Sequence, residues 1–62
     1  MSNLKAIDKI KRIHPQWKRS QITITSILTR MVDDFYILIE FFYRGKRFEY
    51  REDAHGGWID PV

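Results

Sequence analysis

The chain has 62 residues, no cysteine, a formal net charge of +3, and 44% hydrophobic residues. This composition argues against intrinsic disorder and a disulfide framework, and the length allows one small domain near the lower limit for folding unaided. No apolar run approaches the roughly 18 residues of a membrane span, and the start MSNLKAIDK lacks the apolar centre of a signal peptide. We therefore expect a cytoplasmic protein of a prokaryote or its virus, without membrane association.

The first predicted element is a helix over residues 3–13. Ser2 or Asn3 is placed to cap it, and Pro15 prevents much further extension. An apolar stripe at helical spacing consists of Leu4, Ile7 and Ile10, with Ala6 and Ile13 at its border. A stripe of basic residues on another side either stays solvated or faces phosphates or acidic groups. Trp17 in the connector is expected to plug the junction between helix and sheet.

Residues 21–32 fit either a helix or a strand. In a helix, Ile24, Ile27, Leu28 and Met31 would line one face. Seven of the eleven residues from Ile22 to Val32 are β-branched, which restricts χ1 and favours a strand. Asp33-Asp34 would then form a two-residue turn. This strand register pairs Val32 with Phe35, Leu28 with Ile39 and Ile24 with Tyr43.

Residues 35–44 and 47–52 form the clearest strand pair. Apolar residues recur at every second position, at Phe35, Ile37, Ile39, Phe41 and Tyr43 and again at Phe48 and Tyr50. Gly45-Lys46 fits a type II′ turn, because the first position of that turn needs a positive φ. Such a turn pairs Tyr43 with Phe48, Phe41 with Tyr50 and Glu40 with Arg51.

These elements predict an α+β fold in a single domain over residues 1–62. The N-terminal helix packs on a three-stranded antiparallel meander in the order α-β-β-β. Residues 53–62 are expected to form an irregular tail, since Gly56-Gly57 and Pro61 interrupt regular structure. Trp58 in this tail either folds back over the sheet or binds another molecule.

Apolar residues occur on both faces of the predicted sheet, although one helix can cover only one face. The uncovered face would carry an apolar patch rimmed by charge, which is typical of a protein interface. Together with the tail tryptophan, its members are Ile27, Met31, Tyr36, Leu38, Phe42 and Trp58. This pattern favours a regulatory or inhibitory binding protein that forms a homodimer, binds a host protein, or does both. In size and compactness the chain resembles small accessory proteins of phages and mobile elements, which often inhibit or redirect a host factor.

A DNA- or RNA-binding module is the alternative. The basic hairpin tip is suited to entering a groove, and the basic helix face to contacting phosphates. The candidate residues are Lys5, Lys9, Arg12, Lys18, Arg19, Arg44, Lys46 and Arg47. Acidic residues on or beside the same hairpin oppose this interpretation. A basic tip also serves to keep strand edges from aggregating.

Catalytic and metal-binding motifs are missing from the sequence. His14 and His55 fall in separate loops, and adjacent aspartates at a hairpin tip are typical of turns. The chain contains no glycine-rich phosphate loop, no HExxH and no paired CxxC. We therefore expect no enzymatic activity, no cofactor and no metal.

Overall fold

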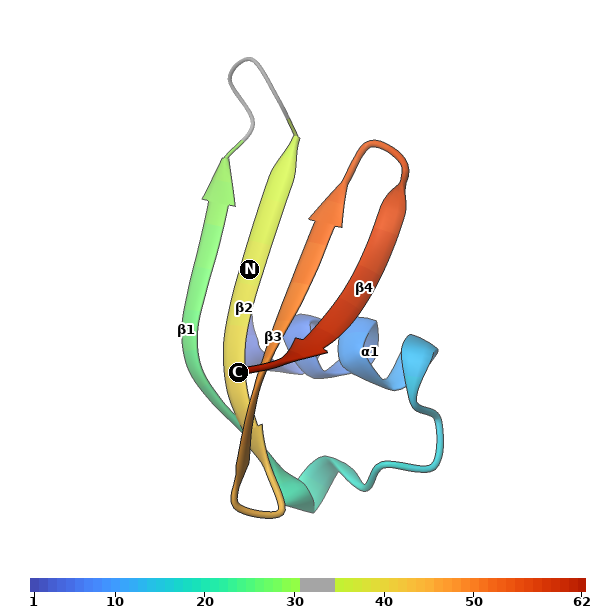
Figure 1. Cartoon of the computed structure of the whole chain (residues 1–62), viewed down its shortest axis with the longest axis vertical. Coiled ribbons are helices and arrows are strands. Elements are labelled where there is room, and N and C mark those ends of the chain that lie inside the picture. The colour runs from blue at the N-terminus through green and yellow to red at the C-terminus, as the bar shows by residue number, and fades with distance from the viewer. Residues whose placement is uncertain (31–34) are drawn as a thin grey trace.

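The computed structural model describes residues 1–30 and 35–62, which form an α+β fold. Its elements are the helix α1 (Asn3–Ile13), the short 3-10 helix η1 (Arg19–Gln21) and the strands β1 (Ile22–Arg30), β2 (Tyr36–Tyr43), β3 (Lys46–Asp53) and β4 (Gly56–Pro61). The strands make one antiparallel sheet in the order β1-β2-β3-β4, and α1 crosses one face of it (Figure 1). No other described element covers the opposite face.

The helix α1 coincides with the range predicted from the sequence. Ser2 Oγ accepts a hydrogen bond from the backbone N–H of Lys5 at 3.2 Å, which caps the N-terminus. Ala6 and Ile10 are fully buried, whereas Leu4 remains 67% exposed. The buried stripe is narrower than predicted, because a short helix laid across the strands contacts them mainly through its middle.

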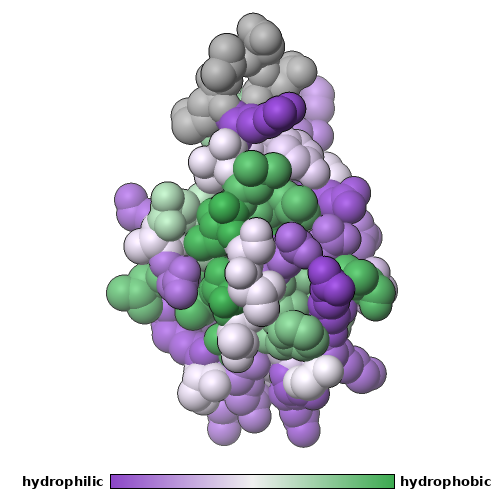
Figure 2. Space-filling model, turned by 90° about the vertical axis from the view of Figure 1, so that its left-hand side faces the viewer, coloured by the Kyte–Doolittle hydropathy of each residue, from purple (hydrophilic) through white to green (hydrophobic). Residues whose placement is uncertain are grey.

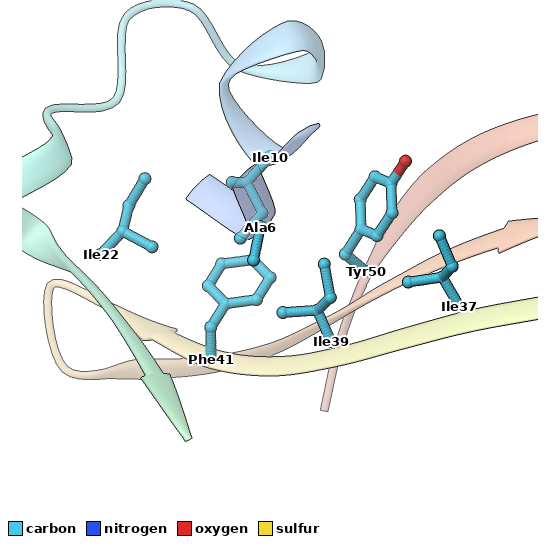
Figure 3. Packing of buried hydrophobic residues seen from close by; sticks show 7 residues of the cluster. All are labelled: Ala6, Ile10, Ile22, Ile37, Ile39, Phe41 and Tyr50. Atoms are coloured by element: carbon cyan, nitrogen blue, oxygen red, sulfur yellow. The ribbon is translucent and has the colours of Figure 1, made fainter. Parts of the chain in front are cut away.

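The core lies between α1 and the inner face of the sheet (Figure 3). Its buried members are Ala6, Ile10, Ile22, Ile37, Ile39, Phe41 and Tyr50. Trp17 packs against the end of this cluster, with its ring centroid 4.0 Å from that of Tyr43 and 5.3 Å from that of Phe48. The predicted position of Trp17 at the junction between helix and sheet is confirmed.

The turn between β2 and β3 differs from the predicted one. Arg44 (φ 51°) and Gly45 (φ 80°) both have positive φ, and Tyr43 pairs with Lys46. This is the type I′ pattern, so the type II′ turn at Gly45-Lys46 was a wrong prediction. The observed pairs are Phe41 with Phe48, Ile39 with Tyr50 and Glu40 with Glu49, in place of Phe41 with Tyr50 and Glu40 with Arg51. The strand register is shifted by two residues from the predicted one. Side chains alternate with a period of two, so each strand residue keeps its predicted face.

A β-bulge between Ile24 and Ser26 changes the alternation of β1. Ile22 and Ile24 before the bulge and Ile27 after it all pack toward the core. Leu28 points to the other face and is 47% exposed. The predicted faces of Ile27 and Leu28 are therefore wrong, because an extra residue in a strand exchanges the two faces beyond it.

The β1–β2 pairing changes accordingly. Ile39 pairs with Ile27 and Tyr43 pairs with Ile22, so the predicted partners Leu28 and Ile24 are wrong. The strand prediction for this segment is nevertheless correct over Ile22–Arg30. The predicted turn at Asp33-Asp34 and the pair of Val32 with Phe35 lie outside the described residues.

The predicted irregular tail forms the fourth strand, so the three-stranded meander was one strand short. Along β3 and β4, Tyr50 pairs with Ile59. Gly57 is required in this strand because a Cβ atom there would overlap the Tyr50 ring. Pro61 is accommodated because β4 is an edge strand, where a missing N–H need not break a ladder.

We predict that Gly57→Ala lowers the free energy of unfolding by about 1–3 kcal/mol, because the added methyl group displaces the buried Tyr50 ring. Urea denaturation followed by circular dichroism measures the change. In a Tyr50→Phe background the cost should be smaller, since the hydroxyl oxygen is the atom nearest to the new methyl group. An unchanged unfolding midpoint for Gly57→Ala would contradict this packing of β4 on β3.

Candidate functional site

The outer face, meaning the face of the sheet opposite α1, carries the side chains that alternate with the core residues. Strand pairing aligns these side chains into rows across the sheet. The apolar row consists of Leu28, Leu38, Arg51 and Trp58. The acidic row beside it consists of Ser26, Glu40, Glu49 and Asp60. The next row holds Thr23, Phe42 and Arg47.

Large apolar side chains are exposed on both sides of the acidic row. Leu28 is 47% exposed and Trp58 40% in the apolar row, and Phe42 on the far side is 39% exposed. Trp58 Nε1 donates a hydrogen bond to Asp60 Oδ2 at 3.1 Å, which orients the exposed indole. Arg51 Nε is buried without an acceptor among the described residues. Its stem therefore lies close against its neighbours and adds apolar surface to the row.

Two ion pairs join acids and arginines of the outer face. Glu40 and Glu49 stand directly opposite on β2 and β3, where like charges repel. Arg47 Nη2 lies 2.9 Å from Glu40 Oε2, and Arg51 Nη2 lies 3.4 Å from Glu49 Oε1. Two carboxylates and two arginines of the face are thus already partnered. This arrangement suits contact with a protein surface better than contact with a phosphate backbone.

The residues predicted to form a protein interface are only partly brought together. Four of them lie on the outer face, namely Tyr36, Leu38, Phe42 and Trp58. Ile27 packs toward the core instead, and Leu28 takes its place on the outer face. Met31 lies outside the described residues. The signal for this exchange is Thr25-Ser26, two consecutive polar residues that break the alternation where the bulge occurs.

The basic residues predicted to contact nucleic acid divide into two groups. Three of them form ion pairs, namely Lys9 with Glu52 at 2.8 Å, Arg47 with Glu40 at 2.9 Å, and Arg19 with Asp8. Arg12 acts electrostatically on Glu52 and Tyr50. Within the described part of the chain, no ion pair involves Lys5, Lys18, Arg44 or Lys46. Arg44 and Lys46 belong to the β2–β3 turn. The cations at the tip of this hairpin are therefore among those without an ion pair.

A polar cluster at the border of the core fastens α1 to β3. Glu52 Oε1 accepts hydrogen bonds from Lys9 Nζ at 2.8 Å and from Tyr50 Oη. Burial raises the pKa of the Tyr50 hydroxyl, and the hydrogen bond to Glu52 raises it further. Burial also raises the pKa of Glu52, but hydrogen bonds from Lys9 and Tyr50 outweigh this effect and leave that pKa below its ordinary value. Both shifts move away from neutral pH, the reverse of what general acid–base catalysis needs.

A pocket of about 420 Å³ lies where β2 turns into β3. Its lining residues are Trp17, Tyr43, Arg44, Lys46 and Phe48. The Trp17 ring is stacked between those of His14 and Tyr43, with a centroid distance of 4.0 Å to each and interplanar angles of 12° and 9°. Sequence reasoning missed this pocket because it treated the aromatic residues as core and the cations as a hairpin tip. Four of the five lining residues lie on one hairpin, within residues 43–48, and the tertiary fold adds Trp17 to them.

Protein-family models, curated proteins and solved structures yield no match to this chain. Its function is therefore inferred from the outer face and the pocket. Among residues 1–30 and 35–62, no helix has the length and apolar character needed to cross a membrane. The same residues contain no cluster of three or more side chains suited to holding a metal ion.

The lowered pKa of Glu52 makes a prediction about pH. A carboxyl group whose pKa is lower in the folded state stabilises the fold above its ordinary pKa, and this contribution is lost as the pH falls through the folded value. We predict that Glu52→Gln lowers the free energy of unfolding at neutral pH, and that its difference from the wild type shrinks below about pH 4. Urea unfolding at several pH values measures this difference. A difference that stays constant with pH would contradict the role given to the Glu52 charge.

Proposed function

We propose that this protein is a non-enzymatic binding module whose outer face is a protein–protein interface, occupied by a second copy of the chain. The observation that carries the proposal is the pattern of the outer face. Exposed Leu28, Phe42 and Trp58 flank charges that are already paired with one another. The solvated face of an antiparallel sheet is ordinarily polar, so this apolar content needs an explanation outside the monomer.

The residue types of the outer face are those that dominate protein interfaces. Tryptophan, tyrosine and arginine supply most binding hot spots, and aromatic residues are enriched at interface centres. Trp58, Phe42, Tyr36 and Arg51 all belong to this face. The indole of Trp58 is held by Asp60 before any partner arrives, so little side-chain order has to be gained on binding.

Two features favour a second copy as the occupant. The molecule measures 34 × 22 × 19 Å and shows the sheet face-on along its shortest dimension (Figure 1). The outer face spans the two longer dimensions, so it is a broad surface for a second copy to cover. The outer face also carries acids and arginines together, so a two-fold arrangement can set the arginines of one copy near the acids of the other.

Dimerisation would compensate for a small core. Only seven hydrophobic residues of the described chain are buried, and domains of this length are marginal by themselves. A dimer formed through the outer face leaves the helix side of each sheet free. The regulatory or inhibitory role toward a host factor that we expect from the sequence would then use this free side.

The nucleic-acid alternative finds less support on the helix than at the hairpin tip. Lys9 is bound to Glu52 and Arg19 to Asp8, which removes two of the cations proposed to contact phosphates. Arg44 and Lys46 make no such pair among the described residues. A nucleic-acid role is therefore favoured only around the β2–β3 turn.

We predict that Phe42→Asp abolishes dimerisation while the circular dichroism spectrum of the folded chain stays that of the wild type. The unfolding midpoint of the variant should no longer rise with protein concentration, because only the dimer adds that stability. The side chain is 39% exposed and outside the core, so its replacement removes apolar interface area and adds a carboxylate to the outer face without disturbing the fold. Sedimentation equilibrium over a range of concentrations measures the mass of each variant.

Leu4→Asp is the control, because it also replaces an exposed apolar side chain by a carboxylate, at a residue of α1 that is 67% exposed and away from the outer face. This variant should dimerise like the wild type. A wild-type chain that stays monomeric at high concentration, or a Phe42→Asp variant with the wild-type mass, would sink the proposed dimer.

A further inference from the structure

The pocket at the β2–β3 turn differs in chemistry from the outer face. We propose that it binds an unpaired nucleobase together with an adjacent phosphate group. This site goes beyond the proposed protein interface and lies on the other side of the sheet. Tyr43 and Phe48 project to the inner face, so a partner on the outer face leaves the pocket open.

Aromatic rings form the apolar walls of the pocket. Trp17, Tyr43 and Phe48 are each half-buried. Both faces of the Trp17 ring are covered, by His14 and Tyr43, so a bound base would meet the edge of Trp17 and stack on Tyr43 or Phe48. Unpaired bases stack on aromatic side chains with little regard to sequence, because every base has a π-face. The volume of about 420 Å³ lies within the roughly 300–1,000 Å³ of typical ligand pockets.

The charged wall of the pocket is formed by Arg44 and Lys46. Both side chains are exposed, and neither makes an ion pair within the described residues. No described acidic side chain lines the pocket. Hydrophilic residues also dominate the surface at this end of the molecule, below the hydrophobic residues gathered along the middle of the β1 side (Figure 2). Two free cations beside aromatic rings match a phosphate beside a base.

The pocket is assembled before any ligand binds. Lys11 Nζ donates hydrogen bonds to the carbonyl oxygens of Trp17 at 2.7 Å and Pro15 at 3.1 Å, which fastens the connector after α1. The backbone N–H of Arg44 donates to the carbonyl oxygen of Gln21 at 3.4 Å, which joins the turn to η1. A site built in advance spends little binding free energy on ordering its own walls.

Fluorescence of Trp17 provides a direct test. The chain has two tryptophans, so Trp58→Phe leaves Trp17 as the sole reporter within the pocket. This variant is titrated with AMP, with a single-stranded oligothymidylate and with a duplex of the same length. We expect both AMP and the single strand to quench Trp17, and the duplex to do so far less because its bases are paired and stacked.

The first two ligands separate the two sources of the same chemistry. Tighter binding of the oligothymidylate, weakening steeply with salt, identifies a nucleic-acid strand as the source. Equal or tighter binding of AMP identifies a free nucleotide. Absence of quenching by both, or equal binding of the duplex, would overturn the proposal. The proposal would also be overturned if an oligoglutamate of the same charge bound as tightly as the single strand. Negative charge alone would then account for binding, without a contact to a base.

Variants of the charged wall locate the site. Arg44→Asn suits the positive φ of this position, since asparagine tolerates that conformation. Combined with Lys46→Gln, it should weaken binding of the single strand about tenfold and reduce the slope of log K against log salt concentration by about 1.4. Lys5→Gln combined with Arg30→Gln is the control for two lost charges, because both residues are exposed and lie outside the pocket lining, and it should bind as before. If the double variant bound the single strand with wild-type affinity, the assignment of the phosphate to Arg44 and Lys46 would be wrong.

The proposed interface and the proposed pocket can fail separately. Phe42→Asp alters the outer face alone, so it should retain binding of AMP and of the single strand. The pocket variants should in turn retain the mass of the wild type. Loss of single-strand binding in Phe42→Asp would show that the ligand lies on the outer face and would overturn the assignment to the pocket.

Discussion

A four-stranded sheet has two faces, and the described chain supplies one α-helix to cover them. α1 and Trp17 close the inner face around Phe41 and Ile39, which are fully buried. Water stays in contact with large apolar side chains on the outer face, and removing that surface from water is favourable. This asymmetry between the faces directs the proposed partner to the outer face.

Strand register decides which side chains reach each face. The bulge in β1 turns Ile27 inward and Leu28 outward, and the type I′ turn carries Arg44 beside the aromatic pocket. The outer face and the pocket are consequently on opposite sides of the same sheet. If both proposals hold, a dimer carries two pockets, and a single strand long enough to reach both would bind with an avidity beyond that of one site.

Much of the fold follows from local pattern. Alternation from Phe35 to Tyr50 predicts β2, β3 and their faces, because an error of two residues in register leaves each side chain on its own face. The bulge adds a single residue to β1, and the alternation pattern did not reveal it. It turns Ile27 toward the core and Leu28 toward the outer face, so Leu28 replaces Ile27 in the predicted interface. β4 escaped prediction because Gly57 and Pro61 look like breakers, although an edge strand packed on the Tyr50 ring accommodates them. The pocket escaped prediction because it needs Trp17, which is far in the chain from the hairpin residues 43–48 that form the rest of the lining.

The central claim is that the outer face meets a second copy of the chain. NMR of side chains over a broad dilution series tests it most directly, because it reports each face separately. We predict that the methyl signals of Leu28 and Leu38 and the indole signal of Trp58 move with concentration, while the methyl signals of the buried Ile37 and Ile39 do not. Outer-face signals that stay fixed throughout the series, or shifts confined to α1, would contradict the claim.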